Sequence, residues 1–319
     1  MFYYNKGIKI NDTTLWLDAQ KSVDVCCVSH GHMDHAKKHR TIIATDKTIR
    51  FLDKRIGKTK SISLKYNESL QVEACSVTLI PAGHILGSAQ VLVEKEGTRC
   101  LYSGDFNLIE CATAEPIEIP ESDVLIMECT FGKPIYRFPE RKIIEEQLLN
   151  FVQSTLKQNA VPVVIGYALG KAQEAMKILG KAGFSLSVHE TVAQLAKIYE
   201  EFGIHFGHWE KFNKHEIDGK VLIVPPSASR TRMVKNLQNK RSVFLSGWAM
   251  HSGTRYRHGV DEALPLSDHA DFDGLLEYIR RVKPKKIYTT HGFKEFPNHL
   301  KQLGFDAEPL KTVNQLSLF

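Results

Sequence analysis

The chain of 319 residues lacks any apolar stretch that approaches the roughly eighteen residues a membrane span needs. Its first residues also lack the charged-then-apolar order of a signal peptide, so we expect a cytoplasmic protein that does not enter a membrane. The six cysteines include no Cys-x-x-Cys pair, and those at 26, 27, 100 and 129 lie in or beside apolar runs. This placement indicates reduced core residues rather than disulfides or metal ligands.

Acidic residues are missing from one segment, although the whole chain has 36 of them against 42 Lys and Arg, for a formal charge of +6. Residues 221–260 contain no Asp or Glu but seven cations: Arg230, Arg232, Lys235, Lys240, Arg241, Arg255 and Arg257. A basic face is often only solvated surface, but a segment without counter-charge favours a polyanionic partner. The length allows two domains, or one large domain with an insertion.

Metal-ligand residue types gather directly after the apolar, strand-like run at 23–28, in the segment His30-Gly31-His32-Met33-Asp34-His35. Imidazole nitrogens and carboxylate oxygens are ligands that zinc and similar cations take. Because alternate residues of an extended chain point the same way, His30 and His32 can reach one ion together. A turn after them would aim Asp34 and His35 at a second ion. The alternative is a solvated polar turn, but a surface loop has no folding reason to collect so many titratable groups.

Three later strand-like runs end in a residue of the same kind. His84 follows one run in a glycine-flanked turn, Asp105 follows the next after Ser103-Gly104, and His291 precedes Gly292 near the end of the chain. Each alone is most often a turn residue. Together they repeat one arrangement, in which small residues let the backbone approach an ion. The sequence therefore predicts a metal site built from distant segments.

Strand-like runs dominate the first third of the chain, at 14–17, 23–28, 41–44, 77–80, 89–94, 99–103 and 124–127, with helical patterning at 46–55. Strands in such close succession favour packed sheets over a doubly wound parallel fold. The pattern then changes to an α/β block, with helices predicted at 140–156, 171–179 and 192–202 and strands at 161–165 and 220–224. We expect β-rich character to return after about residue 250 and to close with a strand at 285–290. An insertion into one metal-binding domain explains this order, whereas two sequential domains would separate His291 from the first cluster.

The metal-ligand pattern resembles that of the metallo-β-lactamase fold, an αββα sandwich with a dinuclear metal site. Three further motifs are similar to those of the β-CASP nucleases: residues 128–132 (ECTFG), 167–174 (YALGKAQE) and 267–271 (SDHAD). Residues 132–137 (GKPIYR), 225–228 (PPSA) and 246–248 (SGW) resemble the bacterial DNA ligase-associated exonucleases within that group. The resemblance covers essentially the whole chain.

The resemblance implies an α+β fold, with a discontinuous metallo-β-lactamase domain at 1–138 and 251–319 and an α/β β-CASP cap at 139–250. One metal ion would be held by His30, His32 and His84. The second would be held by Asp34, His35 and His291, with Asp105 bridging both ions. Asp18 and Glu128 would orient the ligating imidazoles, as such ligands generally require. Three protein ligands for each ion, plus a shared carboxylate, leave the open position of a catalytic site.

The implied cofactors are two divalent ions, zinc first and manganese second, which would generate hydroxide at neutral pH for attack on a phosphodiester. Asp34 would act in catalysis as a ligand. His269 would contact the scissile phosphate and protonate the leaving oxygen, which needs a group that titrates near neutrality. In the cap, the implied substrate contacts are Lys171, Ser227, Ser229, Arg230 and Arg255.

The first expectation is therefore a DNA exonuclease that acts in repair beside a DNA ligase or helicase system. The close alternative is a ribonuclease, because a histidine at the position of His291 is the pattern of the RNA-cleaving β-CASP branch. A further alternative is a small-molecule metallo-hydrolase, since the core fold hosts many reactions. The inserted cap and its uncompensated cations argue against that alternative. Polarity of attack, endo or exo mode, native metal, oligomeric state and direct contact with a ligase are left open by the sequence.

Overall fold

The computed structural model describes residues 1–311, which divide into two compact units. The first unit contains Met1–Glu110, Ala114–Pro134 and the described residues from His269 onward, so it is discontinuous in sequence. The second unit, here called the cap, contains Cys111–Thr113 and Ile135–Asp268. The chain leaves the cap at residue 268 rather than at 250, where the sequence-based division places the return. The reason is that β17 (Glu262–Leu264) pairs with the edge of the cap sheet.

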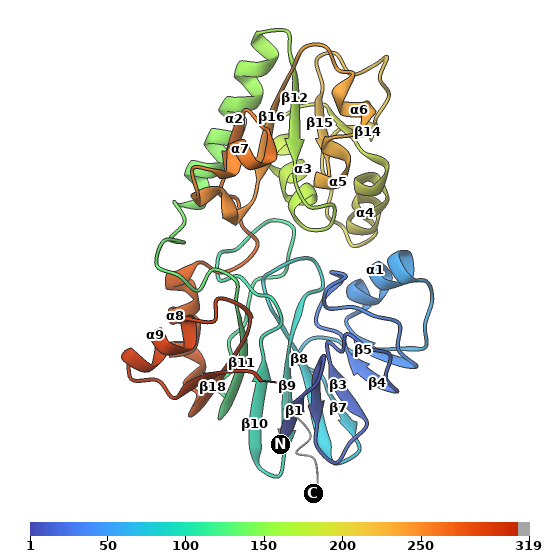
Figure 1. Cartoon of the computed structure of the whole chain (residues 1–319). Helices are drawn as coiled ribbons and strands as arrows, with labels where there is room; N and C mark the ends of the chain where they lie inside the picture. The colour runs from blue at the N-terminus through green and yellow to red at the C-terminus, as the bar shows by residue number, and fades with distance from the viewer. Residues whose placement is uncertain (312–319) are drawn as a thin grey trace, which may run out of the picture. The chain divides into compact units, whose positions relative to one another are not determined.

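The first sheet of the first unit is built from the N-terminal strands in chain order (Figure 1). Its leading strands pair antiparallel, and its later strands pair parallel. In the described chain this sheet has six strands: β1 (Phe2–Tyr4), β2 (Ile8–Ile10), β3 (Leu15–Leu17), β4 (Val25–Cys27), β5 (Thr41–Ala44) and β6 (Ser61–Ser63).

The second sheet combines a run of antiparallel neighbours with parallel strands from both ends of the unit. The pairing of β11 with β18 brings the C-terminal segment beside residues that precede the cap. Over residues 1–311 its order is β19 (Ala307–Pro309), β18 (Lys286–Gly292), β11 (Val124–Cys129), β10 (Thr98–Tyr102), β9 (Ala89–Lys95), β8 (Cys75–Pro81) and β7 (Ser69–Val72).

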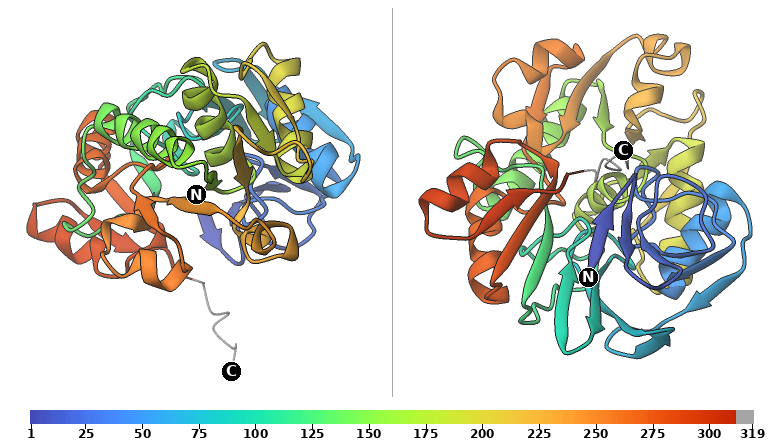
Figure 2. Two further views of the ribbon diagram at one scale, coloured as in Figure 1. Left: turned by 90° about the horizontal axis from the view of Figure 1, so that it is seen from above. Right: turned by 60° about the horizontal axis from the view of Figure 1, so that its bottom comes forward.

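The two sheets of the first unit pack face to face and each is covered on its outer side by helices. Ile10 and Leu15 of the first sheet share a core with Val77 and Val91 of the second. The helix α1 (Asp46–Ile56) buries Leu52 against the outer face of the first sheet. Two helices, α8 (Phe272–Val282) and α9 (Phe296–Gln302), cover the outer face of the second sheet (Figure 1). Figure 2 shows the same layers from two further directions. This is the αββα sandwich that the resemblance predicts.

The cap is a three-layer α/β unit around a sheet whose strands all run parallel. The central strand β12 (Val161–Ile165) is buried along its whole length, as expected for a parallel sheet with helices on both faces. In the described residues its order is β14 (Trp209–Lys211), β13 (Leu186–Val188), β15 (Val221–Val224), β12, β16 (Lys240–Leu245) and β17. The cap helices are α2 (Arg141–Lys157), α3 (Lys171–Lys181), α4 (Glu190–Glu201), α5 (Pro226–Ser229), α6 (Arg232–Lys235) and α7 (Thr254–His258), with a 3-10 turn η1 (Gly247–Met250).

The predicted β-rich character after residue 250 is wrong for much of that region, because α7, α8 and α9 lie there. The sequence does carry a signal for α8: Phe272, Leu275, Leu276, Ile279 and Val282 recur at helical spacing and are all buried. No helix among the described residues combines the length and the apolar character needed to cross a membrane.

Candidate metal centre

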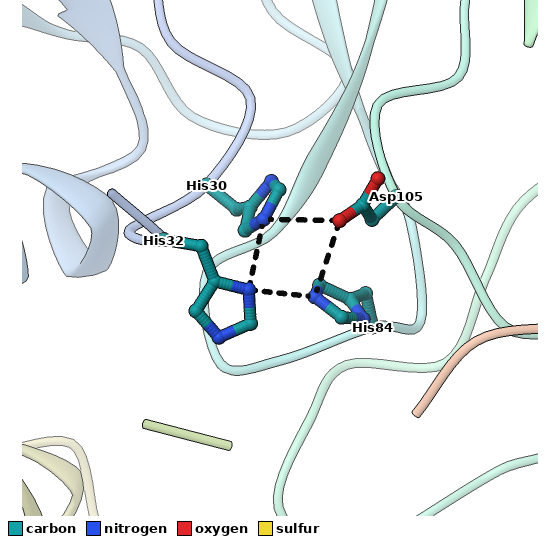
Figure 3. Close-up of side chains that lie close together, drawn as sticks. All are labelled: His30, His32, His84 and Asp105. Carbon is teal, nitrogen blue, oxygen red and sulfur yellow. Dashed lines mark hydrogen bonds and ion pairs between the residues drawn. The ribbon is translucent and has the colours of Figure 1, made fainter. Parts of the chain in front are cut away.

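Four of the predicted ligands meet at one point of the first unit, each delivered by the end of a strand or the loop after it. His30 and His32 follow β4, His84 follows β8, and Asp105 follows β10 (Figure 3). His30, His84 and Asp105 are buried, and His32 is half-buried. Strand ends from both sheets of the first unit therefore bring together residues as far apart as 30 and 105.

The donor atoms of this cluster have the spacing of ligands around a small cation. His32 Nδ1 lies 3.1 Å from both His30 Nε2 and His84 Nε2. Asp105 Oδ2 lies 3.5 Å from His30 Nε2 and 3.9 Å from His84 Nε2. For metal–nitrogen bonds of about 2.0–2.1 Å, the donors of a tetrahedral zinc site are separated by about 3.3–3.4 Å. The residues present therefore fit a divalent ion of this size.

A second group of donors shares Asp105 with the first. His35 Nε2 lies 3.4 Å from Asp105 Oδ2, and His291 completes a group of three whose donor atoms all lie within 4.8 Å of one another. The rings of His35 and His291 have centroids 4.8 Å apart. His291 is exposed and has a φ of 45°, a left-handed backbone conformation that is uncommon outside glycine. Asp105 thus belongs to both groups, which is the position that a bridging ligand needs.

Asp18 lies behind the histidines, where an orienting carboxylate would stand. Its Oδ2 lies 2.8 Å from His35 Nδ1, which leaves the Nε2 atom of that ring to face Asp105. The same carboxylate accepts hydrogen bonds from the Ser29 backbone N–H and from the Tyr102 hydroxyl. Ser29 Oγ also lies 2.9 Å from His30 Nδ1. Ser29 and Tyr102 are not among the residues expected from sequence, because a serine and a tyrosine in strand-like runs carry no pattern of their own.

The electrostatics of the cluster favour an ionised Asp105 and a neutral His30, whereas His35 is held in its protonated form in the absence of a cation. Burial would raise the pKa of Asp105, but the imidazoles of His35, His269 and His30 hold that pKa well below its usual range. Burial, together with the charge of His35, lowers the pKa of His30 well below its usual range. Burial also acts to lower the pKa of His35, but Asp105 and Asp18 raise it well above its usual range. A cation bound between Asp105 and His35 would take the place of that proton.

His269 is fixed by Glu128, the second carboxylate expected to orient an imidazole. His269 Nδ1 lies 2.9 and 3.0 Å from the two carboxylate oxygens of Glu128. The carboxylate is buried and also accepts hydrogen bonds from the Phe106 N–H and the Thr130 hydroxyl. The His269 and His84 ring centroids are 4.6 Å apart. The His269 ring is therefore held beside the first group of ligands.

Glycines are required where the chain turns into the cluster. Gly83 and Gly104 precede His84 and Asp105 and have φ values of 75° and 53°. A Cβ atom on Gly83 would lie 2.2 Å from the Asn107 carbonyl oxygen, too close for any other residue. The small residues beside the predicted ligands therefore serve the close approach that the sequence indicates.

Asp34 is the predicted ligand that the structure does not bring to the cluster. Its side chain is exposed, and it joins none of the groups of metal-ligand atoms found among residues 1–311. Burial lowers the pKa of the Arg55 guanidinium, and the charge of Asp34 acts against that shift. Arg55 Nη1 also donates to the Gly31 carbonyl oxygen at 2.7 Å. After His32 the chain thus leaves the Asp34 side chain exposed and outside the ligand groups.

Lys171, which is expected from sequence to contact the substrate, is buried and paired with carboxylates. Its side chain is 2% exposed, and its Nζ lies 3.0 Å from Asp268 and 3.7 Å from Glu174. Arg141 is also paired with Glu174. A lysine at a helix start is often a phosphate ligand, but here neighbouring carboxylates of the cap already neutralise it.

The other predicted cap contacts are at or near the surface. Ser227 is exposed, and Ser229 Oγ donates to the Pro226 carbonyl oxygen within the short helix α5. The Arg230 guanidinium donates to the Arg257 carbonyl oxygen at 3.1 Å. Arg255 is exposed and its guanidinium lies over the Tyr256 ring.

All six cysteines are free thiols, and those at 26, 27, 75, 100 and 129 are buried.

The chain is similar in sequence to known metallo-hydrolases. A model of the Zn-dependent metallo-hydrolase RNA specificity domain matches residues 258–312, which include His269 and His291. A protein of Opitutus terrae described as a probable DNA ligase is 37% identical over 99% of this chain, which corresponds to 31% of that protein. An RNase J-like protein of Methanocaldococcus jannaschii is 27% identical over 85% of this chain and 82% of its own length. These similarities agree with the resemblance to the β-CASP group of metallo-β-lactamase-fold proteins.

A solved structure supports the fold independently. The crystal structure of a protein of unknown function from Enterococcus faecalis superposes with a TM-score of 0.65 at 16% identity, covering 91% of this chain and 80% of that one. This chain spans about a third of the length of the Opitutus protein and so corresponds to one part of that larger protein.

Proposed function

We propose that this protein is a dinuclear-metal-dependent nuclease of the β-CASP group that hydrolyses phosphodiester bonds in DNA from an end, in ligase-associated repair. The observation that carries the proposal is the preformed group of His30, His32, His84 and Asp105, with donor atoms at the spacing of a metal site. The alignment of nearly the whole chain with a protein described as a probable DNA ligase supports DNA and a ligase context.

The protein residues would hold and orient the ions. His30, His32 and His84 would hold one ion, and His35 and His291 would hold the other. Asp105 would be a ligand of both ions. For Asp34 to be a ligand, its exposed side chain would have to turn towards the cluster. Divalent ions, with zinc first and manganese second, supply Lewis acidity and a water whose pKa falls from about 15.7 towards about 7. Asp18 and Ser29 fix His35 and His30 in the orientation that presents the Nε2 atom.

His269 would hold the proton that the leaving oxygen needs. Glu128 holds the Nδ1 side of the ring, so a proton on Nε2 points away from the carboxylate and is available for transfer. A buried carboxylate behind an imidazole also favours its protonated form, which suits a general acid. The same Nε2 proton can contact a non-bridging phosphate oxygen before the bond breaks.

RNA is the second candidate substrate, and specific observations favour it. His291 stands beside His35 within the ligand group, and a histidine at this position is the pattern that the family resemblance associates with RNA cleavage. The matching RNA specificity model and the RNase J-like relative support the same alternative.

The test compares DNA and RNA strands of one sequence, each labelled at one end, with purified protein and added zinc or manganese. We expect DNA to be shortened progressively from one end, with no activity after chelation. The His30→Ala variant serves as the metal-site control and should be inactive on both strands. Preferential loss of the RNA strand would reverse the order of the two substrates, and cleavage of neither would overturn the nuclease proposal.

A further inference from the structure

A groove within the cap gathers several cations. Two overlapping cavities of about 380 and 390 Å³ form it, between the sheet and the segments that contain α5, α6 and α7. Both are lined by Ile165, Ser229, Arg230, His258 and Val260. Small-ligand sites typically enclose about 300–1,000 Å³, so this groove has room for a ligand the size of a nucleotide.

The floor of the groove is apolar and partly aromatic. Ile165 ends β12, Phe244 lies in β16, and Val260 precedes β17. The His258 ring stacks on the Phe244 ring, with centroids 4.1 Å apart and planes at 19°. Flat rings beside apolar side chains provide the kind of surface on which bases and sugars pack in proteins that bind single strands.

The walls of the groove carry positive charge that no carboxylate neutralises. Arg230, Lys235, Lys240 and Arg257 line it, together with the hydroxyls of Ser229 and Ser242. Within residues 1–311 none of these four cations forms an ion pair. Arg230 and Lys240 donate instead to backbone carbonyl oxygens.

The acidic residues that follow the groove segment have partners other than the four cations, although one of those partners, Ser242, also lines the groove. Asp261 accepts hydrogen bonds from the N–H and hydroxyl of Ser242, and Glu262 pairs with Arg241 at 3.1 Å. Burial lowers the pKa of His258, and the charges of Arg230 and Arg257 lower it further. The part of the shift that comes from the two guanidinium groups is what positive charge produces at a neighbouring imidazole.

We infer that this groove binds a nucleotide unit, with the phosphate between Arg230, Lys235 and Arg257 and the sugar or base over the Phe244–His258 floor. The inference rests on the proposed function for its ligand class, a nucleic acid or its mononucleotide. It extends the two contacts expected from sequence, Ser229 and Arg230, to a site whose cations come from three separate segments of the cap. Phosphate contacts of this kind position a strand without reading its sequence.

The test removes two exposed cations of the groove, Lys235 and Arg257, in the double variant Lys235→Gln/Arg257→Gln. The matched control Lys181→Gln/Lys197→Gln removes the same charge from exposed positions on α3 and α4. Fluorescence anisotropy would follow binding of a nuclease-resistant phosphorothioate single strand over a range of salt concentrations. Melting curves would confirm that both variants are folded, and Lys235→Gln alone provides a milder change at the same site.

For a strand bound in the groove, the slope of log affinity against log salt should fall by about 0.7 for each phosphate that the protein no longer neutralises, or about 1.4 in the double variant. The α3/α4 control should keep the wild-type slope. A second titration replaces the single strand with a mononucleotide. If the groove variant binds the mononucleotide more weakly than wild type but binds the strand equally well, the ligand of the groove is a free nucleotide. Equal affinities of wild type and groove variant in both arms would overturn the inference. Because the experiment measures binding and not cleavage, it tests the groove separately from the proposed nuclease activity. Either proposal can therefore fail while the other holds.

Discussion

Three imidazoles at the metal centre have a partner behind them that decides which ring nitrogen faces the cluster. Asp18 holds His35 through Nδ1, and Ser29 approaches the Nδ1 of His30. Glu128 does the same for His269. The ligand types and their spacing identify the centre in the sequence, but partners such as Ser29 become visible only after folding. Asp34 shows the reverse case: its spacing in the sequence suggests a ligand, but its side chain is exposed in the structure.

Asp18→Asn should weaken metal binding without removing a ligand. The amide cannot balance the charge of His35 as the carboxylate does, so we expect a loss of about 10–100-fold in metal affinity. Competition with a chelating dye would measure the zinc affinity. Asp24→Asn, which changes an exposed carboxylate paired with Arg40 at the surface, is the matched control. Unchanged affinity in Asp18→Asn would show that the carboxylate does not support the site.

His30→Ala and His269→Ala should separate metal binding from proton transfer. Without His30 we expect loss of both bound metal and turnover, because its Nε2 faces two other donors. Without His269 we expect normal metal content and a rate lower by about 10²–10⁴-fold, the usual contribution of a general acid. His215→Ala, at an exposed cap position, should match wild type in both assays. A His269→Ala enzyme with full activity would end the general-acid assignment.

At the scale of elements, the strands that deliver ligands were predictable because each is an apolar run that ends in a polar residue. The predicted runs at 23–28, 77–80 and 99–103 coincide with β4, β8 and β10 to within two residues at each end. The C-terminal helices differ from the prediction because polar residues at strand ends dominate that region and obscure its helical period. Short strands such as β1 and β13 were not predicted because three residues carry too little pattern, and their neighbours in the sheets define them.

Asp271 stabilises the start of one element, the helix α8. Its side chain accepts a hydrogen bond from the Gly274 N–H at 2.8 Å, which caps α8. We expect Asp271→Ala to lower the free energy of unfolding by about 0.5–2 kcal/mol, the usual cost of losing such a cap. Urea denaturation would measure it. Glu277→Ala, on the exposed face of the same helix, should stay within about 0.5 kcal/mol of wild type. Equal stabilities of the two variants would argue against the cap.

At the scale of the whole molecule, the first unit is closed by segments from near both ends of the chain. The parallel pairing of β11 with β18 carries His291 to the sheet edge where β10 delivers Asp105. The discontinuous order follows from the sequence, because the C-terminal histidine needs the N-terminal ligands. The residue at which the chain returns from the cap to the first unit, 268, could not be read from the sequence. It depends on the pairing of β17 with β16 in the cap.

Metal removal should therefore destabilise the protein as well as inactivate it. A ligand bound only by the folded state stabilises by about 2.7 kcal/mol at a hundred times its dissociation constant. We expect chelation to lower the melting temperature and added zinc to restore it. In His30→Ala, zinc should produce a much smaller rise. A melting temperature that does not respond to zinc in the wild type would contradict a site that joins the two ends of the first unit.

The most direct test of the account is anomalous X-ray diffraction, at the absorption edge of the bound metal, from crystals grown with zinc or manganese. The account predicts one peak within bonding distance of His30, His32, His84 and Asp105, and a second shared by Asp105, His35 and His291. Peaks elsewhere, or none among these residues in a protein that binds metal in solution, would contradict it.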